Sequence, residues 1–419
     1  MKVLWVTNIL FSHHLEMVGK NTGKVTGGSW LYAAYDAAKR YKDIELHIAT
    51  VSNVDEIKVS EKDGNVFYIL PGKGSRGYDI KSSVNFDYWR KIREMSTPDV
   101  AIFWGTECRF AYVAMKVMRG LPMAIYMQGV IESIYDHYYE GIPKKYHNAT
   151  LRDFIDRWNK NSTYRTFRSQ VPLERDMFRM ATGVIVENDW CEDMCKSINP
   201  KLKVFRNYLP IRDVFQSCTW SIDNVQRHSI FTNAGGYPIK GHHILFQALG
   251  YVKKVFPDLR CYIPGPKLET FNSIKRQTGY TKMLHDLIKA CGLSNNVVYT
   301  GPLSSEQMVE HLAKCNVYVM PSVMENHSSS LIEAMMLGAP SVGSLVGGTA
   351  SLVQHRENAI LYNSLDARSL AGNIIRIFED DVLAVSLSKN AIKIREHRNG
   401  DFGEEMNVIY KQLFETSCI

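Results

Sequence analysis

The sequence predicts an α/β protein built from two doubly wound, Rossmann-like domains that face each other across a cleft. Short β-like runs alternate with helix-length amphipathic segments along the chain, which is typical of parallel sheets covered by helices on both faces. The alternation restarts near residue 229, and a chain of 419 residues with 45% hydrophobic content is long enough for two cores. Ligands of such proteins bind in clefts between domains.

Each half of the chain contains its own set of expected strands. In the first half these are residues 3–7, 44–51, 66–70, 100–104, 123–126 and 183–186. In the second half they are residues 229–233, 260–263, 297–300, 317–320, 340–342 and 359–361. The polar, turn-prone stretch 208–227 is the expected linker, so we assign residues 1–207 to the first domain and residues 208–389 to the second. Residues 382–414 carry two helical patterns.

Composition indicates the cellular compartment of this protein and the charge of its partners. The chain starts directly with a strand pattern, without the regions of a signal peptide, and no apolar stretch approaches the roughly 20 residues that span a bilayer. We therefore expect a cytoplasmic protein. The eight cysteines are scattered, so we expect reduced thiols. Most of the net charge of +7 lies in the first half, which is the half that would face an anionic partner.

Two glutamates, Glu325 and Glu333, lie eight positions apart around a serine-rich helix start. They follow the buried run 317–320, so their loop should open at the carboxyl end of a parallel strand, where α/β proteins bind ligands. The first N–H groups of a helix beginning near Ser329 suit a phosphate, and the carboxylates can accept hydrogen bonds from sugar hydroxyls. The alternative is a capping box made by Ser330 and Glu333, with Glu325 solvated.

A second candidate phosphate site opens the second half of the chain. After the strand at 229–233, Gly235 and Gly236 allow close backbone approach, and Lys240 places a charge at the head of the next helix. This arrangement suits a diphosphate, although a solvated lysine at a helix start is the simpler interpretation. Gly27 and Gly28 form a weaker anion site before the helical pattern 31–40.

Two missing motifs exclude other chemistries. No Gly-x-Gly-x-x-Gly follows the first expected strand of either half, where a dinucleotide fingerprint would lie, and the single match, at residues 72–77, follows a later strand; this argues against an enzyme that uses NAD or FAD. No Asp-x-Asp occurs either, and hard divalent ions on a diphosphate are held by such carboxylates. We therefore expect no metal and no cofactor, with a nucleotide sugar as co-substrate.

The pattern Pro-Ser, Glu325, seven residues, Glu333-Ala-Met, together with the Lys240-Gly241 pair, resembles the retaining glycosyltransferases of the GT-B fold, group 1, family 4-like. The resemblance implies a hexosyl transfer, with retention, from a nucleotide sugar to a hydroxyl of a glycan or lipid-linked saccharide, as in polysaccharide biosynthesis. It also implies that a helix at 390–419 returns to the first domain.

The same resemblance assigns roles to residues. Lys240 and the helix start at Ser328, Ser329 and Ser330 would stabilise the leaving diphosphate, with His327 beside them. Glu325 would hold the transferred sugar and Glu333 the ribose, while Gly27 and Gly28 would contact the diphosphate or the acceptor. The family usually has an arginine where this chain has Gly235, and a His-Gly pair where it has Gln128-Gly129. Gln128 cannot titrate, so we expect it to orient a sugar.

The acceptor side and the protein's partners are less sharply predicted. The long insert at 8–25 contains His13 and His14, which we place in the acceptor pocket. The basic, aromatic segment 144–179 is either a solvated helix face or a surface that contacts an anionic membrane or a lipid-phosphate acceptor. Nucleic acid is not an expected partner. A nucleotide-sugar epimerase of the same fold and a non-catalytic, nucleotide-sugar-binding partner subunit are the two competing functions.

Overall fold

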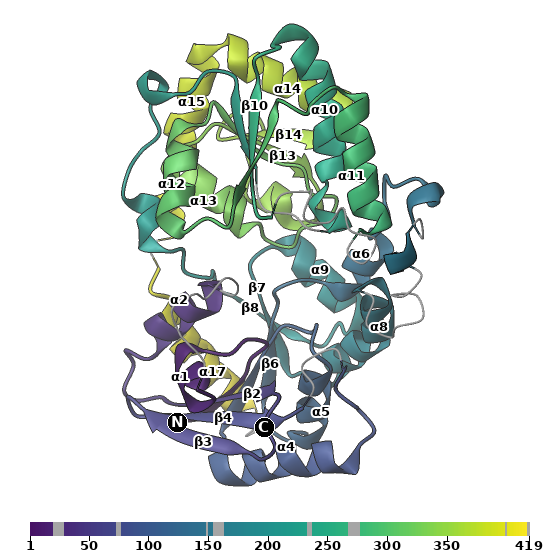
Figure 1. Cartoon of the computed structure of the whole chain (residues 1–419). Coiled ribbons are helices and arrows are strands. Elements are labelled where there is room, and N and C mark those ends of the chain that lie inside the picture. The colour runs from purple at the N-terminus through teal and green to yellow at the C-terminus, as the bar shows by residue number, and fades with distance from the viewer. Residues whose placement is uncertain are drawn as a thin grey trace. The chain divides into compact units, whose positions relative to one another are not determined.

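A computed structural model describes residues 1–19, 29–72, 77–147, 150–153, 163–232, 237–266, 277–398 and 400–416. The chain folds into two compact units, each with one sheet that carries helices on both faces (Figure 1). The first unit comprises residues 1–135, 163–210 and 400–419, and the second comprises residues 136–162 and 211–399. The predicted fold class, with two doubly wound α/β units, is confirmed. Among the described residues, no helix combines the length and apolar character needed to cross a bilayer.

The first unit contains an eight-stranded sheet with the order β3-β4-β2-β1-β5-β6-β7-β8. The strands are β1 (Lys2–Val6), β2 (Glu45–Ser52), β3 (Lys58–Lys62), β4 (Asn65–Pro71), β5 (Val100–Trp104), β6 (Met123–Tyr126), β7 (Gly183–Val186) and β8 (Lys203–Arg206). All neighbours are parallel except β3, which pairs antiparallel with β4 at one edge. The sequence analysis missed both edge strands, β3 and β8, because their polar residues leave no continuous apolar run.

Alternate residues of each strand enter different cores of the first unit. Val3 and Trp5 point into the core that contains α2 (Ser29–Ala38) and α17 (Phe402–Glu415), whereas Leu4 and Val6 point into the opposite one. The opposite core is covered by α4 (Ser83–Ser96), α5 (Arg109–Val117), α8 (Thr163–Met180) and α9 (Asp189–Ile198). Because successive side chains point to opposite faces and both faces are buried, these strands are apolar throughout.

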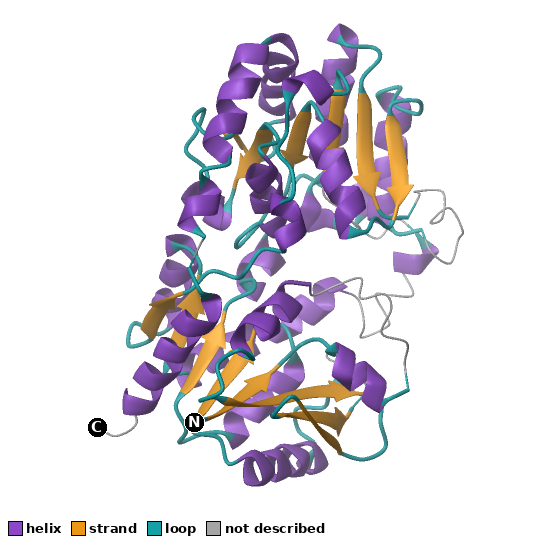
Figure 2. Ribbon diagram, turned by 90° about the vertical axis from the view of Figure 1, so that its left-hand side faces the viewer, coloured by secondary structure: helices purple, strands orange, loops and turns teal. Residues whose placement is uncertain are grey.

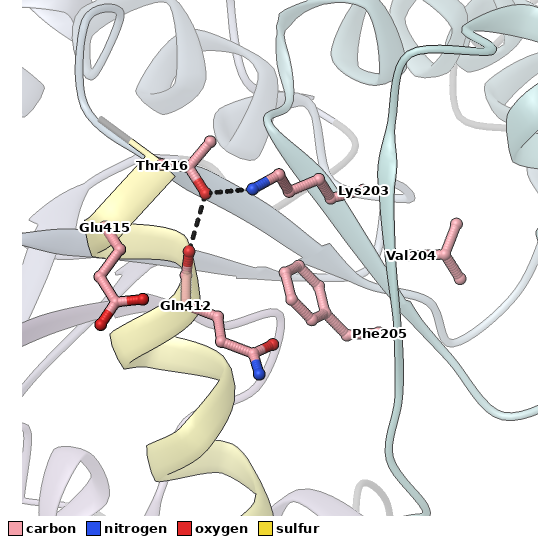
Figure 3. Close-up of a pocket in the computed structure, with 6 residues that line it drawn as sticks. All are labelled: Lys203, Val204, Phe205, Gln412, Glu415 and Thr416. Carbon is pink, nitrogen blue, oxygen red and sulfur yellow. Dashed lines mark hydrogen bonds between the residues drawn. The ribbon is translucent and has the colours of Figure 1, made fainter. Parts of the chain in front are cut away.

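Helix α17 belongs to the first unit although it follows the whole second unit in the chain. Asp401 caps it by accepting hydrogen bonds from the N–H groups of Gly403 and Glu404, and Tyr410 Oη accepts one from Trp5 Nε1 at 3.0 Å. Beside its end, a hollow open to solvent is lined by Lys203, Val204, Phe205, Gln412, Glu415 and Thr416, with Lys203 Nζ donating to Thr416 Oγ1 (Figure 3). None of the predicted site residues lines this hollow.

The second unit contains a six-stranded, fully parallel sheet with the order β11-β10-β9-β12-β13-β14, and Figure 2 shows its arrows running in one direction. The strands are β9 (Ser229–Thr232), β10 (Arg260–Pro264), β11 (Val297–Gly301), β12 (Val317–Met320), β13 (Ser341–Leu345) and β14 (Ile360–Asn363). The helices are α10 (His242–Val255), α11 (Gly279–Ala290), α12 (Ser305–Lys314), α13 (Ser329–Leu337), α14 (Ala367–Glu379), α15 (Asp381–Ala391) and α16 (Ile394–His397). Figure 1 shows α10, α11 and α14 on one face and α12, α13 and α15 on the other.

The units differ from the expected organisation in three places. The stretch 211–227 is part of the second unit, not a free linker, because Trp220 is buried there and its Nε1 donates to Cys315 O at 2.8 Å. Residues 136–162 also belong to the second unit, where Tyr146 Oη donates to Asp286 Oδ2 at 2.7 Å. These contacts join residues far apart in the chain, so local composition does not reveal them. The terminal segment returns to the first unit at residue 400 instead of 390.

Candidate active site

Three neighbouring strands of the second unit lead into adjoining loops, and two of these loops carry predicted donor residues. Lys240 follows β9, Glu325 follows β12, and Gly348 follows β13. The three strands are adjacent and parallel, in the order β9-β12-β13, so their carboxyl ends share one edge of the sheet. Such an edge is where open α/β sheets bind ligands.

Backbone contacts lock these loops together. Lys240 ends the short 3₁₀ helix η4 (Pro238–Lys240), and Gly241 follows it with φ of +69°. A Cβ at Gly241 would lie 1.8 Å from Pro321 O, so only glycine allows this approach between the two loops. Val323 N then donates to Ile239 O at 2.8 Å, and Gly348 N donates to Glu325 O at 3.2 Å.

Lys240 and Glu325 form an ion pair at this edge. Lys240 Nζ donates to Glu325 Oε1 at 2.6 Å, and Ser322 Oγ donates to the same oxygen at 2.7 Å. The side chains are only 22% and 12% exposed, respectively. Desolvation by itself lowers the pKa of Lys240, but the charges of Glu325 and Tyr237 and the hydrogen bond outweigh it, so the pKa is raised above its usual value. Lys240 is therefore a permanent cation.

The start of helix α13 differs from the capping box weighed above. Ser328 is the N-cap, and its Oγ accepts a hydrogen bond from Leu331 N at 3.4 Å. The helix begins at Ser329, so the residue three positions after the cap is Leu331 and not Glu333. The capping-box interpretation is therefore wrong. Glu325 lies four residues before the first residue of this helix, whose positive end would stabilise an anion.

Glu333 instead faces Arg212, which the sequence analysis did not single out. Arg212 Nη2 donates to Glu333 Oε1 at 2.7 Å, and Arg212 Nη1 donates to Ser305 Oγ at 2.5 Å. The guanidinium also lies over the Phe215 ring, 4.6 Å from its centroid. Burial raises the pKa of Glu333, and the charge and hydrogen bond of Arg212 partly offset this. The pair joins residues 121 positions apart, so no local sequence motif predicts it.

His327 lies between these two carboxylates in sequence and contacts Arg398 through Nε2. Burial and the nearby Arg398 charge lower the pKa of His327 well below its usual value. The imidazole is therefore neutral at pH 7. A neutral ring here can take part in hydrogen bonds but adds no charge to a phosphate site.

The predicted acceptor residues are not brought together. Gln128 lies at the carboxyl end of β6, where Asn8 Nδ2 donates to its Oε1 at 2.9 Å. His14 is fully buried, its Nδ1 accepts from Phe11 N, and its Nε2 donates to Ile48 O. Burial lowers the pKa of His14 to about 4. The expectation that His14 contacts an acceptor is wrong, because both ring nitrogens are already used in the core.

His13, the other predicted histidine, contacts the polar edge strand. Its Nδ1 lies 2.9 Å from Glu16 Oε2 and its Nε2 lies 3.0 Å from Ser60 Oγ. The predicted residues Gly27, Gly28, Gly235 and Gly236 lie outside the described residues. Within the described ranges, no three His, Cys, Asp or Glu side chains cluster as metal ligands would, and the expectation of metal independence stays a prediction.

Comparison with known structures defines the class of this fold. Sucrose-phosphate synthase from Thermosynechococcus elongatus superposes with a TM-score of 0.70 at 16% identity, covering 99% of both chains. Anabaena HepE, solved in complex with UDP and glucose, superposes with a TM-score of 0.65 at 19% identity, covering 98% of this chain and 99% of that one. The chain therefore has the GT-B fold of glycosyltransferases.

Sequence comparison finds a family match within the second unit. Residues 227–394 match the family described as glycosyl transferases group 1. The 2-deoxystreptamine N-acetyl-D-glucosaminyltransferase of Niallia circulans is 33% identical over 104 residues, which are 25% of this chain and 27% of that protein. The D-inositol 3-phosphate glycosyltransferase of Corynebacterium urealyticum is 26% identical over 155 residues, 36% and 35% of the two chains. The matched part thus spans about a third or less of these two relatives.

Proposed function

We propose that this protein is a retaining, metal-independent glycosyltransferase that moves a sugar from a nucleotide-sugar donor to a hydroxyl of a glycan or lipid-linked acceptor. The observation that carries the proposal is the partly buried Lys240–Glu325 ion pair, held beside the start of α13 at the edge where three parallel strands end. The match of residues 227–394 to the group 1 glycosyltransferase family supports it.

The leaving diphosphate needs the strongest stabilisation in such a reaction. As the bond to the sugar breaks, negative charge grows on the bridging oxygen and the sugar approaches an oxocarbenium ion. The Lys240 ammonium and the positive end of the α13 helix dipole are preorganised to receive this charge. A second cation or a metal ion has no required role in this scheme.

The two glutamates hold the neutral parts of the donor. Glu325 lies against Lys240, so its carboxylate is placed to accept hydrogen bonds from hydroxyls of the sugar attached to the diphosphate. Glu333 lies four positions after Ser329, the first residue of α13, and would accept hydrogen bonds from the ribose hydroxyls. Arg212 holds its carboxylate in place. Arg212 is therefore a positioning residue.

Retention follows if the acceptor attacks the face from which the diphosphate leaves. The departing phosphate oxygen then lies next to the incoming hydroxyl and can take its proton. No protein side chain is needed as a base, which agrees with the inability of Gln128 to titrate. Holding both reactants in this geometry supplies the rest of the rate enhancement.

A donor screen tests the proposal. UDP-glucose comes first, because the similar HepE was solved with UDP and glucose, and GDP- and ADP-sugars follow. We expect donor hydrolysis with one nucleotide class, transfer to an added saccharide, and a product whose anomeric configuration, read by NMR, equals that of the donor. An inverted product contradicts retention, and an epimerised free nucleotide sugar without transfer identifies the epimerase. Failure to bind any nucleotide sugar in calorimetry refutes the proposal.

A further inference from the structure

A separate polar cluster lies in the first unit, at the carboxyl end of its sheet. Asn8 follows β1, Glu107 follows β5 and Gln128 follows β6, and these three strands are neighbours and parallel. Asn8 Nδ2 donates to Glu107 Oε1 at 2.6 Å and to Gln128 Oε1 at 2.9 Å. One amide group therefore ties together side chains from three loops.

Each side chain of this cluster also has a polar atom without a partner. Asn8 Oδ1, Glu107 Oε2 and Gln128 Nε2 are buried and make no hydrogen bond of good geometry with any described residue. Buried polar groups in proteins are nearly always paired, so three such atoms in one contact cluster point to a missing ligand. Two acceptors and one donor match hydroxyl groups, which both donate and accept. A metal ion would leave the amide donor of Gln128 without a partner.

The backbone is shaped to bring Glu107 into this position. Gly105 has φ of +85°, and a Cβ there would lie 2.1 Å from Glu107 Oε2, so the carboxyl group rests directly on the glycine. Burial raises the pKa of Glu107, although the nearby backbone N–H groups of Thr106 and Glu107 and the hydrogen bond from Asn8 act in the opposite direction. A carboxyl group in this state is better suited to a neutral ligand than to an anion.

Helix α8 fixes the two loops that carry Glu107 and Gln128. Its buried Glu174 accepts from Thr106 Oγ1 at 2.5 Å and from the N–H of Ile131 at 2.9 Å. Gln170, one turn earlier, donates to Thr106 O at 2.6 Å. Thr106 adjoins Glu107 and Ile131 follows Gln128 by three positions, so the cluster is held by packed, hydrogen-bonded neighbours, as preorganised binding sites are.

We propose that Asn8, Glu107 and Gln128 bind a hydroxyl group of an uncharged saccharide acceptor, with Glu107 as the residue that determines which hydroxyl is received. The inference rests on the proposed function, because transfer requires that one acceptor hydroxyl is held in place. Glu107 Oε2 and Asn8 Oδ1 accept from the saccharide, and Gln128 Nε2 donates to a hydroxyl oxygen. None of these steps changes a covalent bond.

Saccharide binding to the full chain is the direct test, and it does not require turnover. Saturation-transfer NMR is recorded with the methyl glycosides of glucose, galactose, mannose and N-acetylglucosamine. We expect at least one to bind the wild type, and both Glu107→Gln and Gln128→Met to weaken that binding about tenfold or more, because each leaves hydroxyls facing a mismatched group. The matched control is Glu94→Gln, a change of the same type on the exposed face of α4 in the same unit.

Kinetics supply the second readout. In both variants, the loss in kcat/KM for the acceptor should exceed any loss in acceptor-free donor hydrolysis by about tenfold. The inference is overturned if no methyl glycoside binds the wild type, or if both variants bind and transfer as Glu94→Gln does. If Glu107→Gln does not fold, Gln128→Met decides. A wild type that binds glycosides through this cluster but cleaves no nucleotide sugar would refute only the proposed function.

Discussion

Replacing Lys240 with methionine separates the structural use of its charge from the catalytic one. Methionine keeps an unbranched stem but removes the ammonium group whose Nζ lies 2.6 Å from Glu325 Oε1. Glu325 is 12% exposed and would have Ser322 as its remaining donor. Removing one partner of a fully buried pair costs about 3–5 kcal/mol, and the 22% exposure of Lys240 reduces this to about 2 kcal/mol of unfolding free energy.

Replacing Glu325 as well removes the carboxylate that Lys240→Met leaves without its cation. In Lys240→Met/Glu325→Gln no buried carboxylate lacks a partner, so most of the lost unfolding free energy should return. Turnover should not return, because the leaving diphosphate still lacks its cation. By analogy with the loss of one preorganised donor, we expect kcat to fall about 100-fold or more in both variants, equivalent to about 2.7 kcal/mol.

Urea unfolding and steady-state kinetics with the donor measure the two effects side by side. Lys314→Met is the matched control, because Lys314 Nζ also lies 2.6 Å from a glutamate oxygen, that of Glu310, but both side chains are mostly exposed. It should change neither quantity measurably. If Lys240→Met keeps its kcat and only raises KM, Lys240 does not act in the transition state. If the double variant recovers turnover together with stability, the loss of rate came from a distorted site.

Three further predictions concern the carboxylates and the metal. Glu333→Gln should weaken donor binding about tenfold, because a charge-assisted contact is lost. The double variant Arg212→Gln/Glu333→Gln should restore the melting temperature but not the affinity for the donor. Unchanged donor affinity in Glu333→Gln would remove Glu333 from the donor site. Burial raises the pKa of Glu174 from 4.5 to about 7, so the folded state binds this proton more tightly than the unfolded state does. The free energy of unfolding should therefore fall by about 3 kcal/mol as pH rises from about 4.5 to about 7, and Glu174→Gln, which cannot titrate, should flatten that slope in urea titrations at several pH values. Turnover should survive EDTA, and a complete loss that Mg²⁺ reverses would contradict metal independence.

The strands that could be predicted from the sequence are those with a continuous apolar run. Each expected run overlaps an observed strand, with ends that differ by at most three residues, since most of these strands are parallel and buried. Strand β3, with the sequence Lys-Val-Ser-Glu-Lys, lies at an exposed edge where polar side chains face water, so its composition resembles that of a loop. Strand β8 lies at the other edge, and its sequence Lys-Val-Phe-Arg has only two apolar residues between charged ones, so it was missed for a similar reason.

The residues of the candidate site also differ in whether the sequence could predict them. Lys240 and Glu325 stood out because the chemistry they serve requires a fixed local spacing on a strand, turn and helix. Arg212, Asn8 and Glu107 did not, because their partners come from distant segments and only the fold makes them neighbours. His14 shows the converse error, since a histidine that satisfies backbone groups in a core has the same local sequence as one that contacts a ligand.

The return of α17 to the first unit affects how this protein is made on the ribosome. Residues 1–210 lack the Trp5–Tyr410 hydrogen bond and the apolar face of Phe402, Met406 and Tyr410 until the whole second unit has been synthesised. During translation the nascent first unit therefore carries an uncovered patch of sheet and helix α2, of the kind that chaperones bind. A stop codon at position 400 would leave every residue of the second unit in place and still prevent the first from completing its core.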